Sequence, residues 1–352
     1  MTPDKVHLVG SIALDSVEDV FRTVGHLLGP LVRRVPDGEP GGRRMWISWQ
    51  YPFLRAQPFL KPDPSISSPR GFPPLILAGE TEIHFGELGY AREARISYQD
   101  FVSARQFGEL PPNVRFQVSL PTPFAVINPF ISPKDAFSVE GPYEAAVVRE
   151  VETICRAIPR HDLCIQWDVC IEMLLWDGRW EGRRDPFGSD LHSEILKRMK
   201  RLAAAVPADV ELGFHLCYGD YDAKHFVEPA DAGKLVEIAN ALATAVTRPI
   251  AYFHMPVPIA RNDDAYFRPL RDLHLAPKTE VYLGLVHLDG VESTRKRIAA
   301  AAHYASDFGV ATECGIARLK TPEQVETLLE TQRQLAKRRC ILIGGLAGLE
   351  DP

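Results

Sequence analysis

The stretch Val210-Glu211-Leu212-Gly213-Phe214-His215-Leu216, together with the segment from Pro229 to Ala245 that follows it, decides the fold class. The first part is short and mostly apolar, which is typical of a buried strand. The second part repeats apolar residues at the spacing of an amphipathic helix. A buried strand followed by a helix of this length is the repeating unit of parallel α/β proteins.

The same unit recurs on both sides of this stretch. Further strands are predicted at residues 5–10, 31–35, 114–120, 163–170, 249–253, 280–286 and 310–313. Helices are predicted after the strands at residues 16–28, 43–54, 142–158, 189–206, 263–273, 291–308 and 322–337. Eight strand–helix units in order predict an α/β protein with a single closed (β/α)8 TIM barrel. We therefore expect residues 1–352 to form one catalytic domain.

Two stretches are too long to be simple connections and are interpreted as insertions after the second and fourth strands. The first runs from about Gln57 to Pro112, has a proline-rich start, and contains a strand-like segment from Glu80 to Phe85. The second covers about Leu174 to Gly188 and is rich in Trp, Arg and Asp. Trp46 and Trp49 precede the first insertion, and we expect them to help shape a pocket beneath it.

The composition is that of an ordinary globular protein. The 352 residues are 45% hydrophobic and 24% charged, with a formal net charge of −6. These values exclude collagen-like, coiled-coil and disordered classes and argue against nucleic-acid or membrane-surface partners. No apolar run is long enough to span a bilayer, and the N-terminus lacks a signal-peptide pattern, so a cytoplasmic location is expected.

Polar side chains stand at the end of nearly every predicted strand. Active sites of TIM barrels are built at these carboxyl ends, so the residues found there are the candidates for chemistry. In chain order they are Ser11, Glu39, Gln166 and Asp168, His215 and Cys217, His254, His287 and Asp289, and Glu313 and Cys314.

A metal site is the most specific of these predictions. His215 and Cys217 are two positions apart in a strand, so their side chains point to the same side. Cys314, at the end of the last strand, can reach the same point across the barrel. One imidazole and two thiolates suit zinc. The fourth ligand is expected from His254, Glu313 or Asp289, or from substrate, and His254 is favoured.

The remaining cysteines and histidines are interpreted as structural. Cys155, Cys164, Cys170 and Cys340 are expected to be buried packing residues. Glu39 and Asp168 are candidates for binding a cationic group such as an amine, unless they only pair with neighbouring arginines. His287 is a candidate general acid or base, or a simple hydrogen-bond donor.

These motifs resemble the C-terminal catalytic barrel of cobalamin-independent methionine synthase. The resemblance covers most of the chain and rests on six segments in the family's order. They are Leu8-Val9-Gly10-Ser11, Asp37-Gly38-Glu39-Pro40, Ile165-Gln166-Trp167-Asp168, His215-Leu216-Cys217-Tyr218, His287, and Glu313-Cys314-Gly315.

The resemblance implies a zinc-dependent methyltransferase. It implies that His215, Cys217 and Cys314 bind zinc, and that Ser11, Glu39, Gln166 and Asp168 bind the acceptor. His287 is expected to handle a proton and Asp168 to act in catalysis. The acceptor would be homocysteine or a related small thiol, and the donor a folate-type compound or another alkyl donor.

The chain departs from the family pattern in ways that mark a divergent member. His254 stands where the family has a zinc-binding Glu. The Trp that stacks on folate is absent, since Asn128 is followed by Pro129. The methyl donor is therefore the part of the function that the resemblance specifies least.

Two alternatives remain open. The same zinc could activate water or polarise a carbonyl in a lyase or hydrolase that uses no folate donor. The chain could also be a metal-free relative of uroporphyrinogen-decarboxylase-like barrels that binds a carboxylated ligand. Metal content and product analysis distinguish the three hypotheses.

Overall fold

An eight-stranded parallel sheet forms the centre of the computed structural model, which describes residues 3–66, 71–79, 82–180, 190–220 and 224–336. The strand order is β1-β10-β9-β8-β7-β6-β5-β2. The strands are β1 (Val6–His7), β2 (Arg34–Pro36), β5 (Arg115–Pro121), β6 (Leu163–Val169), β7 (Glu211–Leu216), β8 (Tyr252–Pro256), β9 (Glu280–Val286) and β10 (Gly309–Thr312). Parallel bridges from Val6 to Val32 and from Ser11 to Gly38 join the first and last strands of this order. The predicted TIM barrel is confirmed.

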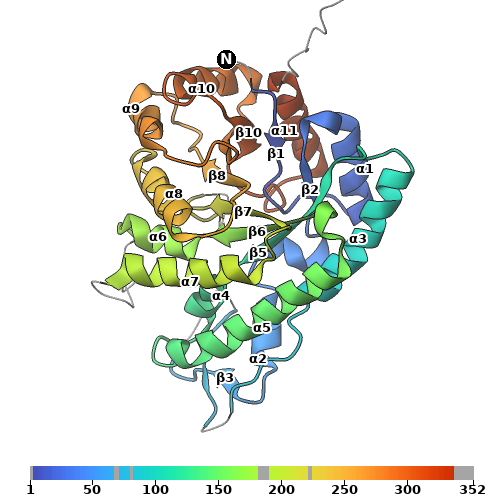
Figure 1. The fold of residues 1–352 in the computed structure, drawn as a ribbon. Helices are drawn as coiled ribbons and strands as arrows, with labels where there is room; N and C mark the ends of the chain where they lie inside the picture. The colour runs from blue at the N-terminus through green and yellow to red at the C-terminus, as the bar shows by residue number, and fades with distance from the viewer. Residues whose placement is uncertain (1–2, 67–70, 80–81, 181–189, 221–223, 337–352) are drawn as a thin grey trace, which may run out of the picture.

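Helices surround the sheet (Figure 1). They are α1 (Val17–Leu27), α3 (Tyr90–Gln106), α5 (Ala136–Ala157), α7 (Leu191–Ala205), α8 (Gly233–Ala245), α9 (Asp264–Phe267), α10 (Gly290–Ala302) and α11 (Pro322–Leu335). Local sequence sets their starts. The Ser16 side chain accepts the backbone N–H of Asp19 at α1, and Thr321 and Gln324 form a reciprocal capping box at α11.

The first insertion lies between β2 and α3, so it includes Met45 and Trp46 and does not extend to Pro112. The barrel helix after β2 is α3, which lies inside the stretch Gln57 to Pro112. The predicted helix from Arg43 to Leu54 is instead a 3₁₀ turn, η2 (Gly41–Met45), followed by the short helix α2 (Gln50–Arg55). The buried face of α3 includes small residues such as Ala94 and Ser97, which weakens the apolar periodicity that reveals a helix.

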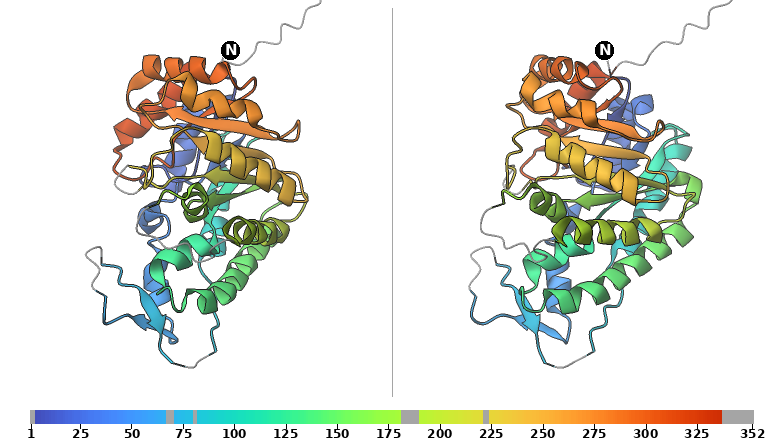
Figure 2. Two further views of the ribbon diagram at one scale, coloured as in Figure 1. Left: turned by 90° about the vertical axis from the view of Figure 1, so that its left-hand side faces the viewer. Right: turned by 60° about the vertical axis from the view of Figure 1, so that its left-hand side comes forward.

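A two-stranded antiparallel hairpin projects from the insertion (Figures 1 and 2). It pairs β3 (Leu60–Pro62) with β4 (Leu75–Leu77) and lies beside α4 (Pro123–Phe130) and α5. The backbone N–H of Ser132 donates to the carbonyl of Leu75, which joins the hairpin to the α4–α5 junction. The predicted strand from Glu80 to Phe85 is wrong for residues 82–85, and residues 80–81 are outside the described part.

The second predicted insertion, Leu174 to Gly188, begins within the short helix α6 (Ile171–Asp177), and most of its remainder falls outside the described residues. Helix α5 starts before Pro142, where the sequence predicted its beginning, and contains that proline. None of the helices in the described ranges combines the length and apolar character that a bilayer-spanning segment needs.

A buried polar network fills the barrel interior below the carboxyl ends of the strands. Gln166 accepts hydrogen bonds at its Oε1 from His7 Nε2 (3.0 Å) and the Tyr252 hydroxyl (2.9 Å). Lower in the barrel, Arg34 pairs with Glu211 and Glu280 at 2.6 and 2.8 Å. Because these buried polar groups have partners, the network holds the strands that carry the candidate site in fixed register.

Candidate metal centre and active-site cavity

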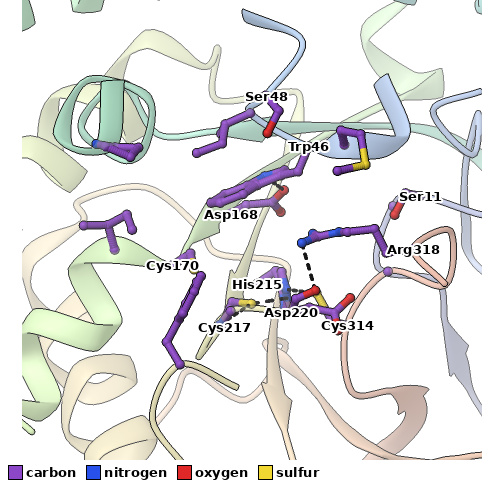
Figure 3. A pocket seen from close by; sticks show the side chains of 18 of the residues that line it. Ser11, Trp46, Ser48, Asp168, Cys170, His215, Cys217, Asp220, Cys314 and Arg318 are labelled. Atoms are coloured by element: carbon purple, nitrogen blue, oxygen red, sulfur yellow. Dashed lines mark hydrogen bonds between the residues drawn. The ribbon is translucent and has the colours of Figure 1, made fainter. Parts of the chain in front are cut away.

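A cavity of about 400 Å³ lies at the carboxyl ends of the strands, where the sequence placed the site. Its polar part contains Ser11, Glu39 and Asp168 beside His215, Cys217 and Cys314. Its apolar wall includes Met45, Trp46, Ile66, Phe72, Phe130 and Trp180. Most of this wall comes from the first insertion and the end of α4. Figure 3 shows Trp46 on one side of the cavity and the His215–Cys217–Cys314 cluster on the other.

The cluster of His215, Cys217 and Cys314 is compact enough to hold one metal ion. One donor atom from each residue lies within 4.8 Å of the others. The Cys217 and Cys314 sulfurs are 3.8 Å apart, and Cys314 Sγ is 3.6 Å from His215 Nε2. With zinc bonds of about 2.3 Å to sulfur and about 2.0–2.1 Å to nitrogen, tetrahedral edges are about 3.8 Å and about 3.6 Å. The donor set suits zinc, and the two distances from Cys314 Sγ match the edges of a zinc tetrahedron.

Both thiols need a cation to ionise. A hydrogen bond with Cys170 and burial raise the pKa of Cys217 well above its ordinary value. A hydrogen bond with Cys217 and burial do the same to the pKa of Cys314. Zinc binds thiolates, so a metal at this point would offset the cost of burying their charge.

His254 does not join the donor cluster, although it was the favoured fourth ligand. Its partner in the β7–β8 register is His215, and its side chain is fully buried. Its Nδ1 lies 2.7 Å from His215 Nδ1, and its Nε2 lies 3.0 Å from the carbonyl oxygen of Thr312. Burial lowers the pKa of His254 to about 3, so the ring is neutral. Both of its nitrogens are thus engaged with His215 and Thr312, and the donor cluster consists of His215, Cys217 and Cys314 without it.

Two carboxyl groups, Glu39 and Asp168, face the same cavity. Burial and the nearby Asp168 raise the pKa of Glu39 to about 8. Burial raises the pKa of Asp168 to about 7, against the hydrogen bonds from Gln166 and Trp46, which lower it. The two groups therefore lack a sufficient positive partner of their own. A cationic ligand group placed between them would favour their ionised forms.

Backbone strain in the described chain is concentrated at this cavity. In the described chain, three residues other than glycine have a positive φ: Glu39 (52°), Trp46 (51°) and Leu319 (51°). Glu39 and Trp46 line the cavity, and Leu319 follows the cavity residue Arg318. Non-glycine residues in this region cost roughly 1–3 kcal/mol each and are characteristic of functional sites.

The last strand brings Gly315 against Ser11. A Cβ at Gly315 would lie 2.3 Å from Ser11 Oγ, so the present position of the Ser11 hydroxyl depends on glycine here. Arg318, on the loop that follows, reaches over the cluster and donates from Nη1 to the backbone carbonyl of Asp220 at 2.9 Å (Figure 3). Ser11 and the Arg318 guanidinium thus give the cavity groups that suit a carboxylate.

Gln166 was predicted to bind substrate, but the structure places it outside the cavity lining. Its side chain is fully buried below the cavity, where Nε2 donates to Asp168 Oδ1 at 2.8 Å. A residue two positions earlier in the strand lies one layer deeper, so Gln166 orients Asp168 from below.

His287, the predicted catalytic histidine, is not part of the cavity lining. Its Nε2 donates to the carbonyl of Val257 at 2.9 Å, and its Nδ1 lies 3.8 Å from Glu313 Oε2. Burial lowers its pKa. The other oxygen of Glu313 is 3.0 Å from Nε2 of His225, a histidine that sequence reasoning treated as structural.

Three further cavity residues were missed as site residues. Cys170 follows Asp168 by two positions, and this spacing alone could have shown that it shares the cavity face. Asp220 and Arg318 stand shortly after Cys217 and Cys314 in loops that leave the strands. No motif marks them, because loop conformation determines where they point.

Three of the solved structures that this chain resembles carry the names of methionine synthases or of a methyltransferase. A vitamin-B12-independent methionine synthase from Shewanella sp. W3-18-1, in complex with selenomethionine, superposes with a TM-score of 0.61 and 14% identity over 96% of this chain and 97% of its own. A candidate vitamin-B12-independent methionine synthase from Listeria monocytogenes gives 0.57 and 15% over 96% and 98%. A methyltransferase from Methanosarcina mazei gives 0.52 and 11% over 95% and 94%.

The fold of this chain is therefore that of vitamin-B12-independent methionine synthases and a related methyltransferase, over nearly the whole length of each. At these identities the likeness establishes the fold, which confirms the resemblance at that level. No family model matches the sequence, and no curated protein matches it.

Proposed function

We propose that the chain is a zinc-dependent methyl or alkyl transferase that acts on the thiol of a small amino-acid-like acceptor. The observation that carries the proposal is the spacing of His215, Cys217 and Cys314. Cys314 Sγ lies at tetrahedral-edge distances from both Cys217 Sγ and His215 Nε2, all three donor atoms lie within 4.8 Å of one another, and all three residues line the cavity. Three protein ligands and an open corner are the arrangement of a catalytic zinc site.

The charged groups around the cavity suit an acceptor such as homocysteine. The carboxyl groups of Glu39 and Asp168 provide the site for its ammonium group. Ser11 and Arg318 provide hydrogen bonds and positive charge for its carboxylate. An acceptor bound at both ends would lie in the same cavity as His215, Cys217 and Cys314, which would hold the metal that binds its thiol.

The reaction is a nucleophilic displacement at carbon. Zinc bound here would lower the pKa of an incoming thiol and keep it ionised at neutral pH. The sulfur attacks the methyl or alkyl carbon, so an S–C bond forms as the bond from carbon to the donor atom breaks. The electron pair of the broken bond stays on the donor, which takes up a proton. The role of His287 in handling that proton stays a prediction, because its ring is not in the cavity wall.

The apolar wall is the proposed site of the donor. Trp46, Phe72 and Phe130 lie on the side of the cavity formed by the insertion and α4. This surface takes the place of the stacking Trp that the methionine synthase pattern has after its third strand. A folate-type compound remains one candidate, together with other donors that have an apolar body.

Metal analysis combined with a thiol alkylation assay tests the proposal. The purified protein is expected to contain one zinc per chain and to convert homocysteine, with a folate or other methyl donor, into its S-methylated product. Cys217→Ser should lose both zinc and methyl transfer. Cys155→Ser is the matched control, since Cys155 is a buried helix residue outside the cavity. A Cys217→Ser variant with full activity would refute the assignment.

A zinc-dependent lyase or hydrolase is the second candidate. The open corner of the proposed metal site favours it, because the same three-ligand arrangement can hold a water molecule. Mass analysis of products separates the two functions. A transferase gives an alkylated thiol and gives no product when the thiol is left out. A lyase or hydrolase cleaves its substrate without any thiol.

A further inference from the structure

His254 replaces a carboxylate ligand of the methionine synthase pattern with an imidazole, and its position in this chain differs from that of a ligand. It is fully buried in β8, directly opposite His215 in the register. Its two ring nitrogens contact His215 Nδ1 and the carbonyl oxygen of Thr312, and the donor cluster consists of His215, Cys217 and Cys314 without it.

The Thr312 carbonyl fixes the proton positions in this chain of groups. A carbonyl oxygen can only accept, so Nε2 of His254 carries a proton and donates it at 3.0 Å. A buried ring without a carboxylate partner is neutral, so Nδ1 of His254 has a free lone pair. At 2.7 Å, Nδ1 of His215 must then be the protonated partner.

The hydrogen bond to His254 also determines which nitrogen of His215 is free for metal. With its proton on Nδ1, neutral His215 has its lone pair on Nε2. That atom is the one that lies 3.6 Å from Cys314 Sγ, on the side of the thiols. A zinc-binding histidine usually donates its other N–H to a carbonyl or carboxylate. Here a second imidazole is placed between the ligand and the carbonyl.

We propose that His254 is a positioning residue that holds His215 in the tautomer able to bind zinc through Nε2, so that the protein supplies three zinc ligands and leaves the fourth corner to the acceptor. This inference rests on the zinc site of the proposed function. It also specifies the charge of the site: two thiolates and one neutral imidazole, without the carboxylate that the family pattern would add.

Direct ligation by His254 is the competing arrangement. Its ring would have to turn away from both present partners to reach the thiols. The turn would leave the N–H of His215 and the carbonyl of Thr312 unpaired in a fully buried layer, and each unpaired group costs roughly 1–3 kcal/mol.

Zinc affinity of the full-length protein, measured by competition with a chromophoric chelator, tests the inference. His254→Phe fills the space but accepts no hydrogen bond, and zinc should bind roughly 10–100-fold more weakly. His254→Asn keeps an acceptor near the position of Nδ1 and should recover much of the loss. His7→Phe is the matched control: His7 is equally buried, with its ring 5.6 Å from that of His254, but bonds to Gln166.

Nitrogen NMR of the zinc-loaded, histidine-labelled parent gives a readout that does not depend on the variants folding. His215 should show a protonated Nδ1 and a metal-bound Nε2, and His254 should show no metal-bound nitrogen. A metal-bound signal from His254 overturns the inference, as does a folded His254→Phe variant with parental zinc affinity. A parent that binds no zinc refutes the proposed function along with it, whereas the first two results leave that function standing.

Discussion

The indole N–H of Trp46 donates a hydrogen bond to Asp168 Oδ2 across 3.2 Å (Figure 3). Trp46 belongs to the inserted segment after β2, whereas Asp168 is near the end of β6. The bond therefore ties the strained backbone of the insertion to the carboxyl group proposed to bind the acceptor.

Replacing Trp46 by Phe should raise the pKa of Asp168 further. The Trp46 hydrogen bond stabilises the carboxylate and lowers the pKa of Asp168. Without it, only the Gln166 hydrogen bond counteracts the rise in pKa that burial causes. A hydrogen bond of ordinary strength corresponds to roughly one pKa unit. The pH above which the acceptor binds tightly should move up by about that amount, as measured by KM across the neutral range. Trp49→Phe is the control, since Trp49 packs edge-on against Tyr90. Identical pH profiles for the two variants would contradict the assignment.

Asp168→Asn should change how stability depends on pH. The pKa of Asp168 is about 7 in the folded protein and ordinarily 3.8, so the folded state holds a proton that the unfolded chain releases. Its favourable contribution is full below the unfolded value and is lost as the pH rises through about 7. The asparagine variant cannot ionise, so it should be more stable than the parent at pH above 7. The gain is roughly 1.4 kcal/mol for each pH unit by which the folded pKa exceeds the unfolded one.

Urea denaturation of metal-free protein on both sides of this pH range measures the effect. Asp162→Asn is a control of opposite sign. Hydrogen bonds from Arg105 lower the pKa of Asp162, so its stabilising contribution is present at neutral pH and lost as the pH falls. Asp162→Asn should therefore be most destabilising at neutral pH. If the free energy of unfolding of the two variants changes with pH in the same way, burial does not raise the pKa of Asp168.

Zinc should stabilise the folded chain, and the effect should depend on Cys314. A ligand present at 100 times its Kd adds about 2.7 kcal/mol to the free energy of unfolding. Calorimetry after chelation and zinc return should show a higher Tm for the parent and for Cys155→Ser. Cys314→Ser should show no such rise, because it removes one of two thiolates. If the Tm of the parent does not change with zinc, the result favours the metal-free barrel that binds a carboxylated ligand.

Gly315→Ala should weaken acceptor binding while leaving the fold intact. The new Cβ would overlap the Ser11 hydroxyl, which can rotate away but then leaves the cavity position. Loss of one hydrogen bond of about 0.5–1.5 kcal/mol would raise KM roughly two- to twelvefold. Gly42→Ala is the control, because a Cβ at Gly42 meets nothing within 4 Å. If both variants bind the acceptor equally well, Ser11 is not part of its site.

The sequence by itself determined the architecture and most of the chemical groups. Each barrel strand is a short apolar run followed by a polar residue, and this local pattern can be recognised whatever the length of the segments between the strands. This pattern predicted the order of the eight units. It also predicted that His215, Cys217 and Cys314 lie close together, because alternate residues of a strand share a side and the carboxyl ends of all barrel strands meet at one face. It missed α3, because small and polar residues on the buried face hide a helical period.

Only the tertiary structure decided how the groups divide their roles. Strand register and ring orientation are properties of pairs of distant segments. They place Gln166 below Asp168, pair both nitrogens of His254 with His215 and Thr312, and leave His287 outside the cavity wall. The fold of the insertion, which no local period specifies, brings Trp46 onto Asp168. Residue type was enough to name the donors, but their partners depend on which side chains the closed barrel places within hydrogen-bond distance.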